Sequence, residues 1–249
     1  MKEIVCDTNV WYDLPDDFKV ENARLVRTFC NVFELLHSDN LVKRFDVGLK
    51  AIKALCAGGG IENFYWFNPF AHVMFLESGR APYLQEQETL SKIILQIAEG
   101  QISQEEFLEQ LRRASKDDEL RNIAQDLNSM FDKRIVTIPD DKNDSIEWTK
   151  VYISWRVTEW AKTLGIEYYM QRNFDWSRIE LFLNVQALFI RKVVFLKMKY
   201  QPKDMFDLWN MVYVSPGNLY WTKEGQGTNR IRWHNLIKEA GMEHYLFDQ

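Results

Sequence analysis

The stretch Ile4-Val5-Cys6-Asp7-Thr8-Asn9 decides the fold, because it predicts a buried strand that ends at an acid. Ile and Val favour buried strands, whereas Asp and Asn favour strand ends. A carboxylate that directly follows a parallel strand stands at the sheet edge where α/β proteins bind ligands. Asp7 with Thr8 and Asn9 is also a typical turn or helix N-cap. This stretch alone leaves both interpretations open.

The bulk composition narrows the class of protein. The 249 residues are 46% hydrophobic and 27% charged, as in a typical soluble domain. The net charge of −5 repels phosphate backbones, so nucleic-acid binding would need a local basic patch or a bound metal. Cys6, Cys30 and Cys56 lack paired spacing and are expected to be reduced thiols. With no leader pattern and no membrane-spanning apolar run, we expect a cytoplasmic protein that does not contact membranes.

A second strand is predicted over residues 25–30, and a helix follows it. Asn31 is a good N-cap, so Val32-Phe33-Glu34-Leu35-Leu36 would open the helix with Glu34 at its third position. A glutamate there can reach back to the N-cap backbone as part of a capping box. It can equally serve as a metal-binding carboxylate beside Asp7. The local sequence supports both interpretations.

The middle of the chain, residues 61–200, is predicted to be largely helical. Helical periodicity recurs over residues 90–98, 119–131, 148–170 and 176–200. Residues 64–70 read Phe-Tyr-Trp-Phe-Asn-Pro-Phe and form the densest aromatic stretch. Such a stretch can stack on unpaired bases, but packing beneath a loop or against a partner chain is the commoner use, and we expect the latter.

Two further acids stand near the C-terminal end. Pro202 breaks the preceding helix, and Asp204 then begins a new one as its expected N-cap. Asp207 falls in the first turn, where the helix dipole favours an acid. Asp204 and Asp207 are three residues apart and so share one face. Residues 218–222 predict another strand, and Glu224 follows it.

Acids therefore recur at places that a parallel α/β sheet would bring to one edge. Several carboxylates together repel one another and destabilise the fold unless a cation neutralises them. Ligation by oxygen alone suits Mg²⁺ or Mn²⁺. Such ions can activate a water for attack on a phosphodiester. The acids at these places are Asp7, Glu34, Asp207 and Glu224, and in such a sheet they can converge.

Three motifs of this pattern resemble those of PIN-domain ribonucleases. Val5-Cys6-Asp7-Thr8-Asn9 resembles their opening strand, and residues 32–36 resemble their second motif, a helix that carries a glutamate. Residues 204–213 together with 219–224 are similar to their closing motif. The match covers roughly the first forty and the last fifty residues. The family usually has Asp as its fourth acid, where this chain has Glu224.

The resemblance implies a fold and a set of site residues. The fold would be a Rossmann-like three-layer α/β/α sandwich with a parallel central sheet. It would form a single PIN-like domain over residues 1–249, in which residues 61–200 are largely a helical insertion. The implied catalytic metal ligands are Asp7, Glu34, Asp207 and, as a fourth, Glu224, with Asp204 as the alternative third acid. Asn9 and Thr222 would orient the ligands or waters.

The resemblance also implies an activity. We expect a metal-dependent endoribonuclease that cleaves single-stranded RNA through carboxylate-bound Mg²⁺ or Mn²⁺, with DNA as another possible substrate. The alternative is a catalytically weak or inactive PIN-like scaffold that binds RNA or a protein partner. A protein inhibitor or a second copy of the chain are further possible partners. The four histidines lack zinc-site spacing.

Overall fold

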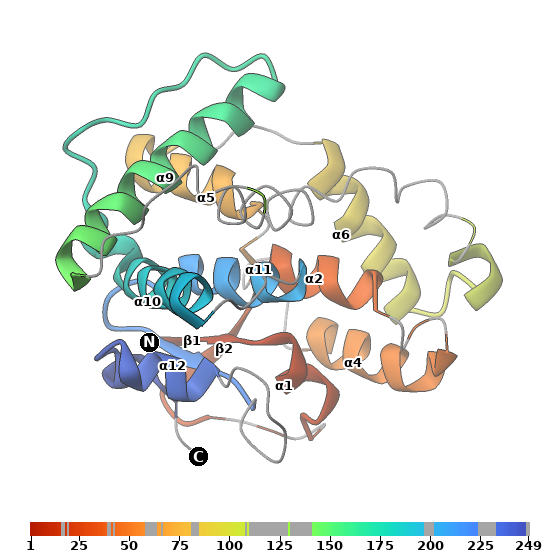
Figure 1. Cartoon of the computed structure of the whole chain (residues 1–249). Coiled ribbons are helices and arrows are strands. Elements are labelled where there is room, and N and C mark those ends of the chain that lie inside the picture. The colour runs from red at the N-terminus through yellow and green to blue at the C-terminus, as the bar shows by residue number, and fades with distance from the viewer. Residues whose placement is uncertain are drawn as a thin grey trace.

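A small parallel sheet lies at the centre of a mostly helical chain in the computed structural model (Figure 1). The described strands are β1 (Lys2–Cys6), β2 (Ala23–Thr28), β3 (Phe64–Tyr65) and β4 (Leu219–Trp221). Their order is β3-β2-β1-β4, and each neighbouring pair is parallel. The structure describes residues 1–15, 18, 20–38, 41, 43–57, 64–65, 67–80, 85–107, 109, 129, 141–196, 202–223 and 233–247. The predicted α/β class with parallel strands is confirmed.

Strand β1 is central and buried on both faces. The side chains of Ile4, Val5 and Cys6 have no exposed surface. Successive side chains of a strand point to opposite faces. Accordingly, Ile4 and Cys6 belong to one hydrophobic cluster, whereas Val5 belongs to another together with Val26 of β2. A near-continuous apolar strand is what a parallel sheet covered on both faces requires.

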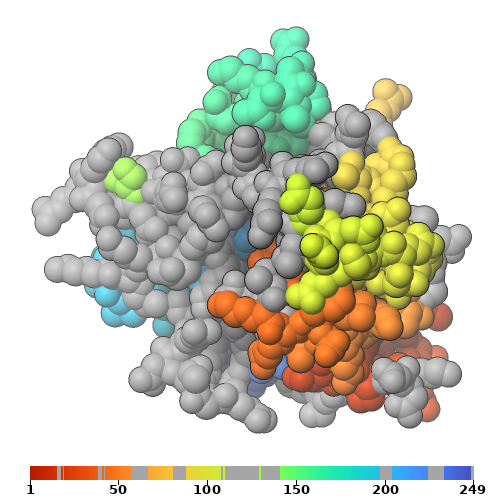
Figure 2. Space-filling view, turned by 90° about the vertical axis from the view of Figure 1, so that its right-hand side faces the viewer, coloured from red at the N-terminus to blue at the C-terminus, as the bar shows by residue number. Residues whose placement is uncertain are grey.

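Helices supply the rest of both clusters. The Ile4 cluster contains residues of α1 (Thr8–Tyr12), α2 (Phe29–Leu36), α4 (Phe45–Ala57) and α6 (Gln85–Ala98). Figure 2 shows α4 in orange and α6 in yellow side by side on one face of the molecule. The Val5 cluster contains residues of α5 (Pro69–Ser78), α9 (Lys142–Thr163), α10 (Glu180–Leu196), α11 (Pro202–Asn210) and α12 (Trp233–Glu239).

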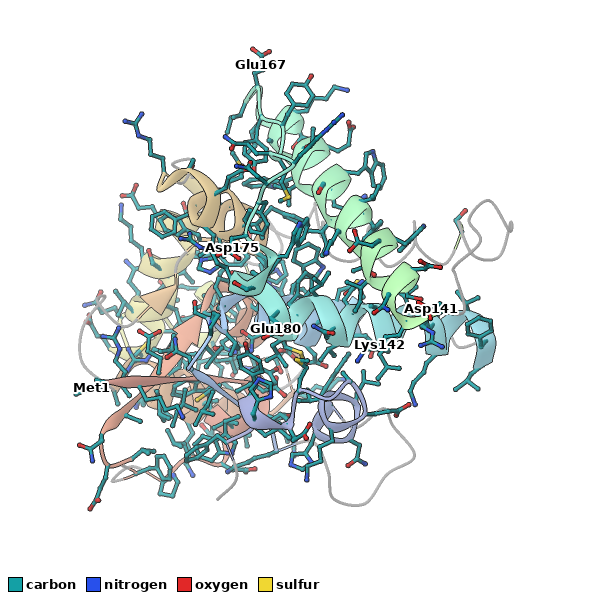
Figure 3. All side chains as sticks on the ribbon, turned by 90° about the vertical axis from the view of Figure 1, so that its left-hand side faces the viewer. Met1, Asp141, Lys142, Glu167, Asp175 and Glu180 are labelled. Atoms are coloured by element: carbon teal, nitrogen blue, oxygen red, sulfur yellow. The ribbon has the colours of Figure 1, made fainter. Side chains whose placement is uncertain are left out.

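The middle of the chain is built into these clusters. Helices α5, α9 and α10 share their cluster with strand residue Val5. Figure 3 shows α9 rising from Lys142, and α10 beginning at Glu180. Helix α9 differs from the expected 148–170. It begins six residues earlier, at Lys142, because Asp141 caps it there, and it ends at Thr163, before Gly165 with a φ of +70°. The limits of the proposed insertion over residues 61–200 stay a prediction.

The aromatic stretch over residues 64–70 ends inside the core. Asn68 caps α5, with its side chain accepting a hydrogen bond from the Ala71 N–H at 2.9 Å. Phe70 is buried and packs on Trp160 and Trp209, with ring centroids 5.5 and 4.6 Å away. Phe70 therefore serves packing, as expected. The side chains at 64–66, and most of the predicted helix over residues 119–131, lie outside the described residues.

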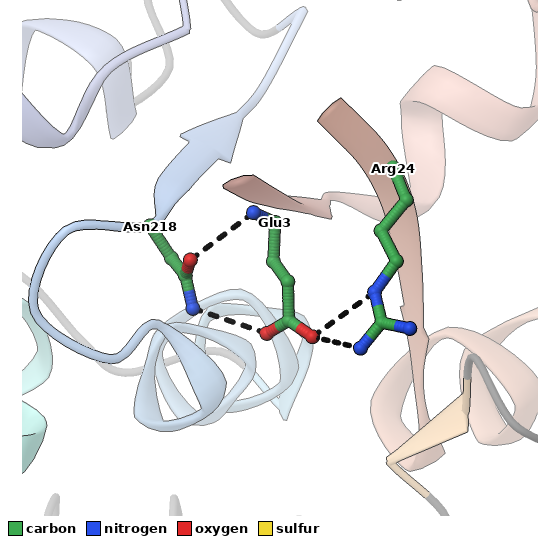
Figure 4. Close-up of polar contacts among 3 residues, drawn as sticks. All are labelled: Glu3, Arg24 and Asn218. Atoms are coloured by element: carbon green, nitrogen blue, oxygen red, sulfur yellow. Dashed lines mark hydrogen bonds and ion pairs between the residues drawn. The ribbon is translucent and has the colours of Figure 1, made fainter. Parts of the chain in front are cut away.

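A polar clamp fixes three segments at the amino end of the sheet (Figure 4). The Glu3 carboxylate of β1 accepts hydrogen bonds from the Arg24 guanidinium of β2 and, at 3.0 Å, from the Asn218 amide that precedes β4. The Glu3 N–H donates to Asn218 Oδ1 at 3.1 Å. Arg24 is largely exposed, so this pair adds little stability by itself. Its role is to hold the register of β1 between its two neighbours.

The C-terminal segment runs beside β4, where the Phe247 N–H donates to the Tyr220 carbonyl at 2.9 Å. Residues Glu243–Tyr245 form a turn of 3₁₀-helix, and Leu246 makes an isolated parallel bridge to Tyr220.

In the described part of the chain, none of the helices combines the length and the apolarity that crossing a membrane requires. The cytoplasmic location stays a prediction. Cys6, Cys30 and Cys56 carry free thiols.

Buried His72 on α5 should make stability depend on pH. Burial lowers the pKa of His72 from 6.5 to about 4, and its ring lies 4.7 Å from that of Tyr213. The native state therefore favours the neutral ring, and stability present above pH 6.5 is lost as the pH falls towards 4. Over that window we expect wild type to lose roughly 3 kcal/mol more than His72→Phe. Urea unfolding of both proteins at several pH values measures this, and parallel pH profiles would exclude it.

Candidate metal centre

Asp7 is the first residue after β1 and lies at the carboxyl edge of the sheet. Its N–H donates to the Trp221 carbonyl of β4 at 2.8 Å, which continues the ladder. Its Oδ1 accepts from the Thr8 N–H at 2.7 Å and so caps α1. Its Oδ2 accepts from Asn9 Nδ2 at 2.9 Å and from Thr222 Oγ1 at 2.8 Å. Asp7 is thus an N-cap, as one interpretation predicted, and it stands at the carboxyl edge of the sheet, where the other interpretation placed it.

Glu34 comes from α2, and the start of that helix corrects a prediction. Thr28, rather than Asn31, is the N-cap: its Oγ1 accepts from the Asn31 N–H, and the Thr28 N–H donates to Asn31 Oδ1. Asn31 at the third helical position therefore completes the capping box. The sequence pattern missed this because Thr28 also suits the end of a strand. Glu34 stands at the sixth position, in the second turn, so it is not the capping-box residue.

Asp207 comes from α11, whose start corrects a second prediction. The helix begins at Pro202, which suits a first helical position because it has no N–H to lose. Asp204 is therefore the third residue of the helix and not its N-cap. Asp207 is the sixth, in the second turn. Its Oδ2 accepts a hydrogen bond from the indole Nε1 of Trp233 on α12 at 2.7 Å, and both side chains are buried.

The fold brings three of the expected acids together. Asp7, Glu34 and Asp207 each offer a carboxylate oxygen, and these three oxygens all lie within 4.8 Å of one another. Asp7 and Asp207 are buried, and Glu34 is half-buried. Asp204 is buried one helical turn away and does not belong to this group. Glu224 lies outside the described residues. We call Asp7, Glu34 and Asp207 the acid trio.

The sheet order explains where the trio lies. The chain adds β2 and β3 on one side of β1 and then returns to place β4 on the other side. The strand order thus reverses between β1 and β4. In open α/β sheets, ligands bind at the carboxyl ends of the strands where the order reverses. Asp7 after β1 and Thr222 after β4 meet at that point, because Cys6 is paired with Trp221 in the register.

A buried polar network ties the three acid-bearing segments together. Asn210, at the end of α11, donates from Nδ2 to the Cys6 carbonyl at 3.0 Å and accepts from Thr28 Oγ1 at 2.6 Å. Asn31 Nδ2 donates to the same Cys6 carbonyl at 3.0 Å and to Thr8 Oγ1 at 3.2 Å. All of these residues are buried. Because each acid lies within three residues of a member of this network, the network fixes the relative positions of the segments that carry the acids.

The electrostatics of Asp7 disfavour its ionised form. Burial raises the pKa of Asp7 above its ordinary value of 3.8, while hydrogen bonds from Thr222, Thr8 and Asn9 and a contact with Asp207 lower it in part. Because the folded pKa exceeds the unfolded one, the associated stability is lost as the pH rises through the shifted pKa. The donors that hold Asp7 and the indole that holds Asp207 are neutral. A cation among these oxygens would oppose that effect.

Asn9 and Thr222 both contact Asp7 directly, and Asn9 also accepts a hydrogen bond from the Lys223 N–H at 3.1 Å. Sequence reasoning missed Trp233, Asn31 and Asn210 as residues that position the acids. Their residue types gave no signal, because the partners of Trp233 and Asn210 lie 26 and 204 positions away.

In comparisons with known proteins, the chain matches no family model, no curated protein and no solved structure.

Proposed function

We propose that this protein is a metal-dependent endoribonuclease that cleaves single-stranded RNA at the acid trio. The observation that carries the proposal is the convergence of Asp7, Glu34 and Asp207, from three separate elements, at the point where the strand order reverses. Three ionised carboxylates that lie this close repel one another and lower the stability of the folded protein. A site that serves function accounts for that arrangement, since stability alone does not favour it.

The residues fit a hard divalent cation. Asp7, Glu34 and Asp207 offer only oxygen ligands, and Mg²⁺ and Mn²⁺ prefer such ligands. A divalent cation would offset the repulsion among the trio and the cost of ionising buried Asp7. It would also give a protein of net charge −5 a local attraction for phosphate. We propose Glu224 as a fourth ligand on the resemblance of its motif to the family.

The chain's own residues have separate roles in this proposal. The bound ion supplies Lewis-acid stabilisation of a phosphodiester and lowers the pKa of a water. Thr222 and Asn9 hold Asp7 Oδ2 in place, and the Thr8 N–H holds Oδ1. Trp233 holds Asp207 Oδ2. These donors leave little freedom to the carboxylates, and ligands that are already ordered lose little entropy when they bind.

The finer fold assignment belongs to the same proposal. Two hydrophobic clusters meet opposite sides of β1, which supports a three-layer α/β/α sandwich. The strand order and the trio support a PIN-like domain, in agreement with the motif resemblance. RNA as the substrate follows from that resemblance. A single-stranded DNA of the same sequence therefore belongs in every assay.

The neighbouring acids of α11 give a sharp test. We expect Mn²⁺ to raise the melting temperature of wild type and to start cleavage of single-stranded RNA. Asp207→Asn should lose both effects, because one charged ligand is removed while an oxygen remains for Trp233. Asp204→Asn makes the same chemical change one turn away and should keep both. The expected gain in stability is about 2.7 kcal/mol at an ion concentration a hundredfold above the dissociation constant.

The possible outcomes separate the alternatives. Loss of both effects in Asp204→Asn alone would make Asp204 the third ligand. Wild-type protein that shows neither metal stabilisation nor cleavage would contradict the proposal and favour a non-catalytic scaffold. Cleavage of the DNA and not of the RNA would keep the metal centre and change the substrate.

A further inference from the structure

A column of stacked rings leads from the core to the surface beside the acid trio. Phe206 of α11 stacks on Phe33 of α2, with ring centroids 5.2 Å apart and planes inclined by 21°. Phe33 in turn stacks on His37, with centroids 4.0 Å apart and an angle of 19°. Phe206 is buried, Phe33 is half-buried and His37 is exposed. The column therefore ends at the surface on the imidazole ring of His37.

The exposed ring is held in one orientation. His37 Nδ1 lies 2.8 Å from the Phe33 carbonyl oxygen, and since a carbonyl can only accept, Nδ1 carries the proton of this hydrogen bond. Phe29 supports Phe33 from within α2, with centroids 5.9 Å apart. The next residue, Ser38, is tied to α1 by a 2.9 Å hydrogen bond from the Tyr12 hydroxyl. The ring is thus a preorganised flat surface.

The column comes from the same two helices, α2 and α11, that carry two members of the trio. Phe33 immediately precedes Glu34, and Phe206 immediately precedes Asp207. His37, the C-cap residue of α2, follows Glu34 by three residues, and its N–H still bonds to the Phe33 carbonyl one turn back. Side chains three apart on a helix are neighbours, with Cβ atoms about 5–6 Å apart. An aromatic ring and a proposed metal ligand therefore share one patch of the surface.

We propose that the His37–Phe33–Phe206 column is a nucleobase subsite. An unpaired base stacks on the exposed face of His37 while an adjoining phosphate reaches the acid trio. Stacking needs no basic residue, which suits an acidic protein. It accepts any base, because every base has a flat face, but it excludes bases that are stacked inside a duplex. The inference rests on the proposed nuclease function and adds how its single-stranded substrate is held.

Binding measurements test the subsite apart from the chemistry. The probe is a short fluorescent single-stranded RNA, measured by anisotropy with Ca²⁺ in place of Mn²⁺, beside a matched oligomer that lacks bases. We expect His37→Ala to weaken RNA binding about tenfold, the size of one lost stacking contact. His37→Tyr, which restores an uncharged ring, should bind within about twofold of wild type. The oligomer without bases should bind wild type and His37→Ala equally.

Steady-state cleavage with Mn²⁺ gives a second readout. His37→Ala should raise KM and leave kcat within about twofold, since a stacked base is held alike in the ground and transition states. Equal RNA binding by wild type and His37→Ala would overturn the subsite, and so would failure of His37→Tyr to restore binding. RNA binding that depends on the bases, without any cleavage, would support the subsite while the nuclease proposal fails. Cleavage by wild type with a KM that is unchanged in His37→Ala would support the nuclease proposal and overturn the subsite.

Discussion

Asp7→Asn should abolish Mn²⁺-stimulated cleavage of single-stranded RNA while leaving the protein folded. Loss of a residue that merely supports a metal ligand typically lowers metal affinity or activity about 10–100-fold. Because Asp7 is itself a proposed ligand, we expect the cleavage rate to fall at least about a hundredfold. The variant side chain keeps an oxygen for the Thr8 N–H, but its amide nitrogen cannot accept the hydrogen bond from Asn9 Nδ2. A neutral amide is also cheaper to bury than a carboxylate, so the two effects oppose each other and the metal-free variant should stay folded, with a melting temperature close to that of wild type.

Asp141→Asn is the matched control for this experiment. Asp141 is also a helix N-cap, and its Oδ1 accepts from the Asn143 and Asp144 backbone N–H groups at the start of α9. It is exposed, and it lies outside the acid trio. The same chemical change there should leave the cleavage rate unchanged. An Asp7→Asn enzyme that retains more than about a tenth of the wild-type rate would remove Asp7 from the proposed mechanism.

Asn210→Ala should have the largest effect on stability among the polar substitutions considered. It removes the hydrogen bonds of Asn210 to the Cys6 carbonyl and from Thr28 Oγ1 at a fully buried position. A buried polar group left unsatisfied costs about 1–3 kcal/mol, and here two bonds are lost, so we expect a destabilisation of roughly 2–4 kcal/mol. The free energy of unfolding from urea titration, followed by circular dichroism, measures the change.

Asn184→Ala provides the comparison. Asn184 is a partly buried helical asparagine whose side chain donates to the Glu180 carbonyl one turn back, at 3.0 Å, within its own helix. Its loss should cost less than about 1 kcal/mol. Similar effects at Asn184 and Asn210 would contradict the view that the network of Asn210 holds α11 against the sheet.

The sequence predicted those parts of the fold that local pattern determines. Residues 4–6 indicated a buried parallel strand, and Asp7 was expected at its end. The start of α2 was misplaced by three residues, because Thr28 satisfies the preferences of a strand end and of an N-cap equally well. The prediction of an N-cap at Asp204 is wrong for a similar reason: a proline suits a helix break and a first helical position equally well, and α11 begins at Pro202.

The interactions that build the site were only partly predictable. That acids at the ends of parallel strands converge follows from sheet geometry, and the trio matches that expectation. Which of Asp204 and Asp207 points to the sheet depends on how α11 packs, and no local pattern fixes that. The indole of Trp233 reaches Asp207 from a helix that begins 26 residues later. Such partners are determined by tertiary packing, so periodicity and spacing contain no record of them.

The centre draws on residues near both ends of the described chain, since Thr222 reaches Asp7 across 215 positions. During synthesis on the ribosome, Asp7 and Glu34 emerge long before Asp207 exists. A nascent chain, or a product of a premature stop codon upstream of α11, therefore carries two acids of the trio and lacks the third. The complete trio can form only after α11 has been translated, so a shorter chain cannot cleave the messenger that encodes it if the proposed cleavage requires all three acids.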